Sequence, residues 1–123
     1  MISVEYCRLL ARYNRWMNER LYAAASTLPD DERKRDRGAF FGSIHRTLAH
    51  ILWADRVWHG RFVGEVPALP AYGADDHPDF AELSRERERV DRVILDWTGK
   101  LGDDWLATTL EYRAASDGAL RRM

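Results

Sequence analysis

Three of the four histidines in this 123-residue sequence fall in one segment with helical periodicity, and histidine is the commonest metal ligand among side chains. They are His45, His50 and His59. At about 100° per residue, His45 and His50 project about 140° apart, and His50 and His59 about 180° apart. His45 and His59 share a side but lie about 21 Å apart along the axis. The spacing therefore excludes two of these imidazoles binding one ion from a single helix, as in an HEXXH motif.

Asp55 lies four residues before His59, near the centre of the apolar stripe of the same segment. A buried carboxylate is costly unless it is paired, so Asp55 must find a partner. We expect a structural hydrogen bond or salt bridge, either to His59 or to an arginine of another helix. The alternative is a carboxylate that lines a functional site.

Other polar residues are weaker candidates. Asn14 and Asn18 form an i,i+4 pair that could face a site, although the pattern favours solvent exposure. From its position alone, His50 is interpreted as a histidine at a packing interface. The alternating charges of residues 85–89 are typical of a salt-bridged solvent face. Cys7 shows no sequence signal of a reactive thiol, which favours a buried thiol.

Three long helical segments must position these side chains. The first begins at a cap, Ser3, and ends before Pro29; the second runs from about Ala39 to Val63, and the third from Asp79 to Gly102. We expect one apolar stripe of each helix to form the core. The stripe of the first helix is Tyr6, Leu9, Leu10, Tyr13, Trp16, Met17, Leu21 and Ala24, and that of the second is Ile44, Leu48, Ile51, Trp58 and Phe62, with Phe40 and Phe41 at its start. The stripe of the third helix is Phe80, Leu83, Val90, Ile94, Trp97 and Leu101, interrupted only by Arg87.

The remaining stretches are expected to connect these helices. Residues 29–38 are mostly charged and predict a solvated connection, and residues 64–78 carry three prolines, which predicts a loop. Beyond the third helix, the spacing of apolar residues changes from three or four to two. Alternation from Leu106 to Tyr112 and a turn signal at residues 117–118 predict a short hairpin-like segment.

The sequence thus predicts an all-α fold in a single domain over residues 1–123. Three long amphipathic helices with short connections favour an up-down-up helical bundle. Such a bundle is normally closed by a fourth helix. With three helices, we expect one apolar side of the bundle to be open unless a partner covers it.

Charge and composition exclude several classes of protein. Nineteen Lys and Arg residues against 20 Asp and Glu residues give a formal net charge of -1, which predicts no nucleic-acid partner. Apolar runs fall short of the roughly 18 residues of a membrane span, and the N-terminus lacks the regions of a signal peptide. The single cysteine cannot form an intrachain disulfide. We expect a cytoplasmic protein without a membrane partner.

Residues 36–58, DRGAFFGSIHRTLAHILWADRVW, closely resemble the DinB-like family of metal-dependent enzymes. Residues 13–18, YNRWMN, and residues 60–62, GRF, agree with that resemblance. It implies a four-helix bundle, commonly dimeric, that binds nickel or zinc through three histidines. His50 matches the first metal ligand, and His45 and Asp55 match recurrent motif positions. The other two ligands would come from an H-x-x-x-H motif on a fourth helix, which is expected to start just after Met123, so we expect the chain to be C-terminally incomplete.

The resemblance also implies an activity. We expect a divalent metal ion that activates water or a low-molecular-weight thiol for hydrolysis or thiol transfer on a small-molecule substrate. The alternative is a non-catalytic helical dimerisation or interaction protein with a degenerate metal site, and a homodimer is expected in either case. Five further residues are expected to line the site or to hold its metal-binding side chain in place: His45, Asp55, His59, Asn14 and Asn18.

Overall fold

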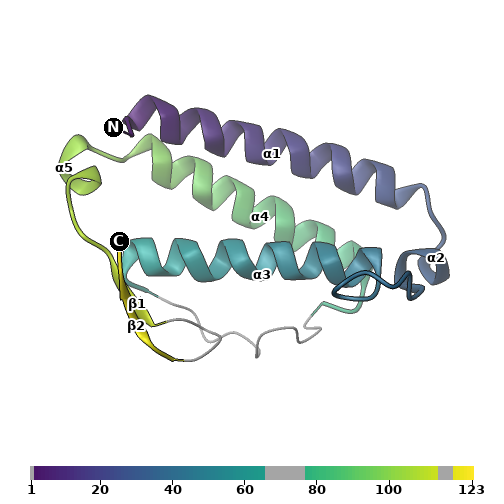
Figure 1. Ribbon diagram of the computed structural model, residues 1–123. Helices are drawn as coiled ribbons and strands as arrows, with labels where there is room; N and C mark the ends of the chain where they lie inside the picture. The colour runs from purple at the N-terminus through teal and green to yellow at the C-terminus, as the bar shows by residue number, and fades with distance from the viewer. Residues whose placement is uncertain (1, 66–76, 114–117) are drawn as a thin grey trace.

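The computed structural model describes residues 2–65, 77–113 and 118–123. Its elements are three long helices, two short helices and one antiparallel pair of strands (Figure 1): α1 (Val4–Ser26), α2 (Asp30–Lys34), α3 (Ile44–Val63), α4 (Phe80–Gly99), α5 (Asp103–Leu106), β1 (Glu111–Arg113) and β2 (Leu120–Arg122). The predicted all-α class and its three long helices are confirmed. Across the described residues, none of these helices is long and apolar enough to cross a membrane.

The third long helix runs in a different direction from the one predicted. At one end of the bundle the ring of His45 lies 6.3 Å from that of Phe80, and at the other end Phe62 stacks on Trp97 at 5.5 Å. The N-terminal ends of α3 and α4 therefore lie side by side, and so do their C-terminal ends. The two helices are parallel, and both run opposite to α1 (Figure 1). Periodicity gives the buried face of a helix but not its direction, which is why the pattern missed this arrangement.

Local signals explain where the helices begin and end. The Ser3 hydroxyl accepts a hydrogen bond from the Tyr6 amide at the start of α1, and Asp79 accepts one from the Ala81 amide at the start of α4. The connection at residues 29–38 is not wholly irregular, because it contains α2. Three acidic residues occupy the first turn of this short helix, and two basic residues follow, as the helix dipole favours.

The second long helix begins at Ile44 rather than near Ala39. Gly42 has a φ of +89°, which is outside the helical region, and its amide donates to the Ala39 carbonyl in a tight turn. Ser43 then caps the helix by accepting from the Arg46 amide at 3.1 Å. Phe40 therefore precedes the helix and is 86% exposed, instead of starting its apolar stripe.

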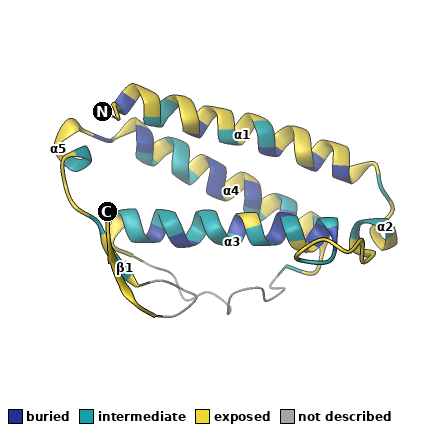
Figure 2. Ribbon diagram, viewed as in Figure 1, coloured by how far each residue is buried: buried dark blue, intermediate teal, exposed yellow. Residues whose placement is uncertain are grey.

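The core lies between the three long helices, but α1 contributes a different face from the predicted one. The buried residues of α1 are Val4, Ala11, Asn18, Tyr22 and Ala25, and they pack mainly along α4. At about 100° per residue, these positions lie on the opposite side of the helix from the predicted stripe. That stripe is exposed (Figure 2), with relative exposures of 43–55% at Tyr6, Leu9, Leu10, Tyr13, Trp16 and Leu21. We call these six residues the apolar face of α1.

The C-terminal segment closes one end of the bundle. The strand prediction is correct only for its last residues, because Leu106 belongs to α5 and β1 begins at Glu111. Gly118 has a φ of +69°, while Asp117 lies outside the described residues. The Arg61 guanidinium lies 4.6 Å from the Trp58 ring and 4.4 Å from the Tyr112 ring, and it donates to the Arg113 carbonyl. Arg61 therefore fastens the strand pair to α3.

Candidate functional site

His45 holds together two parts of the chain. Its side chain is fully buried, and its Nε2 lies 2.7 Å from the carbonyl oxygen of His77, just before α4 begins. With Nε2–H as donor, the imidazole fixes the entry to α4 against α3. His77, whose carbonyl takes this bond, is partly buried. The geometry thus gives His45 a structural contact.

His50 lies on another side of α3, between two aromatic rings. Its ring stacks on Phe41 at 3.9 Å and on Trp53 at 5.5 Å, both with an interplanar angle of 22°. Desolvation lowers the pKa of His50 below its usual value. The side chain is therefore held flat between its neighbours as the neutral imidazole, which is the form that binds metal ions.

The described residues do not by themselves form a metal site. Within residues 2–65, 77–113 and 118–123, no group of three or more His, Cys, Asp or Glu side chains could hold an ion. A catalytic metal site generally uses three protein ligands, so His50 could supply only one of them. His59 packs edge-on against Trp97 at 5.3 Å, and desolvation lowers its pKa as well. As the spacing predicted, the structure does not bring the histidines of α3 together.

The most distinctive feature of the bundle is a set of five polar side chains, three of them buried and two partly buried, which we call the polar network: Asn14 and Asn18 on α1, Asp55 on α3, and Arg87 and Asp91 on α4. Arg87 Nη2 donates to Asp55 Oδ2 at 2.6 Å and to Asp91 Oδ1 at 2.7 Å, and its Nε donates to Asp91 Oδ1 at 3.0 Å. Asn14 Nδ2 donates to Asp55 Oδ2 at 3.2 Å, and Asn18 Nδ2 donates to Asp91 Oδ1 at 3.0 Å. The network joins all three long helices.

The predicted partner of Asp55 is therefore an arginine of another helix, and no hydrogen bond joins Asp55 to His59. The expected solvent exposure of Asn18 is wrong, because that residue is 5% exposed, and Asn14 is partly buried. Arg87 is 2% exposed, so the solvent face predicted for residues 85–89 does not include it. Sequence reasoning missed Arg87 and Asp91 as network members. The available signal was the place of Arg87 within an apolar stripe, with a carboxylate four residues later.

Burial and pairing act in opposite directions on Asp91. Desolvation raises the pKa of this carboxyl above its usual value, while the charge and hydrogen bonds of Arg87 and the bond from Asn18 lower it. Burial is the larger effect, because one guanidinium is shared between two carboxylates. The network consequently carries a formal charge of -1 when both aspartates are ionised.

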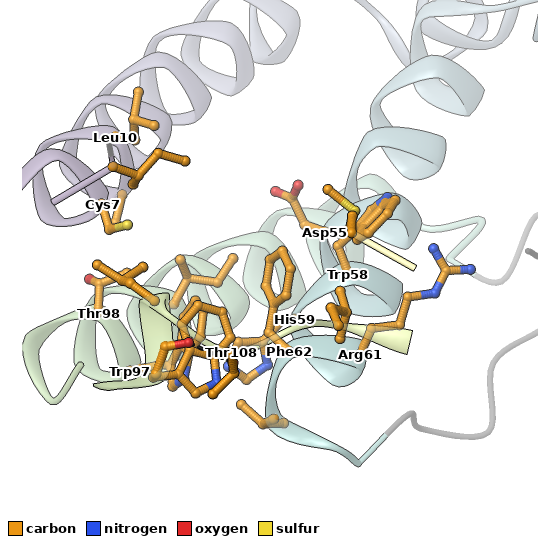
Figure 3. A pocket seen from close by; sticks show the side chains of 18 of the residues that line it. Cys7, Leu10, Asp55, Trp58, His59, Arg61, Phe62, Trp97, Thr98 and Thr108 are labelled. Carbon is orange, nitrogen blue, oxygen red and sulfur yellow. Dashed lines mark hydrogen bonds between the residues drawn. The ribbon is translucent and has the colours of Figure 1, made fainter. Parts of the chain in front are cut away.

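A groove of about 710 Å³ opens beside the network, between α1 and the C-terminal half of α3. Its walls are mainly apolar and include Trp58, Trp97 and Trp105, while Asn14, Asp55 and His59 are among its polar lining residues. Figure 3 shows the Asp55 carboxylate directed into this space, with Leu10 and Cys7 across from it. The structure thus places three of the predicted site residues in one groove, whereas His50 is not among its lining residues.

Comparison with known proteins gives one positive result. The model of the DinB family matches residues 1–119, nearly the whole chain. Neither a curated protein nor a solved structure matches the chain significantly.

Proposed function

The chain belongs to the DinB family, and from this premise we propose that it acts as a divalent-metal-dependent enzyme to which His50 supplies one metal ligand. The family match carries this proposal. We further propose nickel or zinc as the ion and a small molecule as the substrate, with hydrolysis or transfer of a low-molecular-weight thiol as the reaction. A bound divalent ion would lower the pKa of a water molecule or thiol in its coordination sphere.

The residues around His50 support its role as a ligand. Phe41 and Trp53 fix the plane of the imidazole, so little rotamer freedom is lost when an ion binds. Desolvation keeps the ring neutral, so no proton has to be displaced. Because the described residues hold no complete ligand set, we propose that the remaining ligands come from residues outside the described ranges.

Replacing His50 by alanine is expected to lower the nickel or zinc content of the protein by about tenfold or more. Loss of a single outer partner of a metal ligand already costs about 10–100-fold in affinity, and loss of a ligand should cost at least as much. Metal content is measured by elemental analysis after dialysis against each ion.

His59→Gln is the matched control, because His59 is another partly buried histidine of α3 and lies in the groove instead. It is expected to retain the metal. Equal metal content in His50→Ala and the unaltered protein would exclude His50 as a ligand.

A second candidate function is supported by the apolar face of α1. Six large apolar side chains, 43–55% exposed, lie along one side of this helix. Contiguous exposed apolar surface of this kind typically marks an interaction site. We propose that this face joins two copies of the chain, so that homodimerisation is part of the function whether or not the protein is catalytic.

The double variant Leu9→Glu with Trp16→Glu is expected to dissociate the dimer, because a two-fold axis would bring the new carboxylates of both copies to one interface. Leu120→Glu is the control, since Leu120 on β2 is 57% exposed and lies outside the apolar face of α1. Sedimentation equilibrium measures the mass. A monomeric unaltered protein, or a double variant that stays dimeric, contradicts the proposed interface.

A further inference from the structure

The groove has the size and lining of a site for a small organic molecule. Its volume of about 710 Å³ lies within the roughly 300–1,000 Å³ of typical ligand pockets. Aromatic side chains from three helices form its walls: Trp58 and Phe62 from α3, Trp97 from α4 and Trp105 from α5. Phe62 stacks on Trp97 and meets Trp105 edge-on at 5.6 Å, so the aromatic wall is continuous.

Three residues of the polar network are charged, Asp55, Arg87 and Asp91, and we call them the triad. Of these three, only Asp55 reaches the groove with substantial exposure. Its side chain is 29% exposed, compared with 2% for Arg87 and 3% for Asp91. Both hydrogen bonds recorded for Asp55 go to Oδ2, from Asn14 and Arg87, and the carboxylate points into the groove (Figure 3). A negatively charged oxygen thus faces a mainly apolar space.

The charge balance of this part of the bundle favours a cation as the occupant. Arg87 offsets only one of the two carboxylates it contacts, so the triad lacks one positive charge. Arg61 also lines the groove, but its guanidinium lies against the Trp58 and Tyr112 rings and donates to the Arg113 carbonyl. His59 does not supply the missing charge, because desolvation lowers its pKa and favours the neutral ring.

We propose that the groove binds a small organic cation, an amine whose ammonium group pairs with Asp55 and whose apolar body lies against Trp58, Trp97 and Trp105. An ammonium in this position completes the charge of the triad. An anionic ligand would meet the uncompensated carboxylate. The inference does not depend on the proposed metal-dependent function, because His50 does not line the groove.

Two probes of nearly the same shape test the proposal on the unaltered protein. 2-Phenylethylamine carries the ammonium group, and 2-phenylethanol replaces it with a neutral hydroxyl. Calorimetric titration at low salt is expected to show saturable binding of the amine, about tenfold tighter than that of the alcohol, as one charge-assisted hydrogen bond would give. Equal affinities for the two probes, or no saturable amine binding, would overturn the proposal.

The variant Asp55→Asn tests whether the Asp55 carboxylate causes the preference for the amine over the alcohol. The variant leaves Arg87 paired one-to-one with Asp91, so the buried charges become balanced, and the amine is expected to lose its advantage over the alcohol. Asp96→Asn is the control, with the same change in net charge on the exposed side of α4. An Asp55→Asn variant that keeps the tenfold preference contradicts the proposed pairing.

A second variant does not disturb the polar network. Leu10 lines the groove and is 47% exposed, so the charge of a lysine in its place would lie at the groove. Because Leu10 also belongs to the apolar face of α1, the mass of the variant is measured by sedimentation equilibrium, and binding is compared at a concentration where both proteins have the same oligomeric state. Leu10→Lys is expected to weaken amine binding about tenfold by repulsion and by competition for Asp55, with little effect on the alcohol. Unchanged amine affinity would contradict an ammonium bound at this place.

Discussion

Arg87→Ala is expected to lower the free energy of unfolding by about 3–5 kcal/mol, the largest loss that any single substitution should cause here. The variant removes the only cation that contacts Asp55 and Asp91 among the described residues. Asp91 is 3% exposed, so its carboxylate would lose its paired charge at a position that is largely withdrawn from solvent. With a typical domain stability of about 5–15 kcal/mol, such a loss can unfold much of the protein. Urea unfolding followed by tryptophan fluorescence measures it.

The same experiment separates the cost of an unpaired charge from the net value of the ion pairs. A triple variant, Arg87→Met with Asp55→Asn and Asp91→Asn, removes all three charges while keeping side-chain volume. It is expected to regain most of the lost stability, because burying ions offsets much of what their attraction contributes. If the single variant loses less than about 1 kcal/mol, or if the triple variant is the less stable of the two, the network does not act through charge compensation.

Leu83→Ala is expected to lower the free energy of unfolding by about 3 kcal/mol, within the range of about 2–5 kcal/mol for buried leucines. Leu83 is fully buried in the cluster shared by the three long helices, with Tyr22, Leu48 and Leu52. Removal of its isobutyl group leaves a cavity that rigid helices close only in part. Chemical unfolding at submicromolar protein concentration measures the effect on the single chain.

Leu9→Ala is the matched control, because Leu9 belongs to the stripe that periodicity assigns to the core. It is 53% exposed, so the expected change in the same measurement is within about 0.5 kcal/mol. A loss at Leu9 as large as that at Leu83 would mean that α1 turns its apolar face inward. The pair of variants therefore tests which side of α1 faces the core.

The sequence was sufficient for the number and approximate limits of the long helices, because caps and spacings of three or four act locally. The Ser3 and Asp79 caps are examples. Residues 39–43 were misassigned, because Phe40 and Phe41 continue an apolar pattern across a glycine turn. For α1, the apolar stripe was evident, but a stripe does not tell whether the rest of the same chain covers it. The direction of α4 depends on how the chain returns from Val63, which no local pattern records.

Part of the candidate site was also predictable. A carboxylate in an apolar stripe required a partner, and the structure supplies Arg87. The identity of that partner was hidden, because the charges at residues 85–89 resemble a solvent face and only burial distinguishes Arg87 from its neighbours. The groove could not be predicted, since its walls combine α1, α3, α4, α5 and the strand pair. The proposed role of His50 remains a prediction.

The pairing of Asn18 with Asp91 also determines how α1 is placed lengthwise along α4. Buried positions of α1 recur every seven residues at Val4, Ala11, Asn18 and Ala25, and most of these side chains are small and apolar. A slide by two turns would present nearly the same surface at these four positions, although it would also take Tyr22 away from its stack on Phe80. The slide would put an alanine opposite Asp91 and leave the buried carboxylate without its amide donor. Asn18 and Tyr22 together therefore select a single register, and the asparagine acts as a buried polar residue does in a coiled coil.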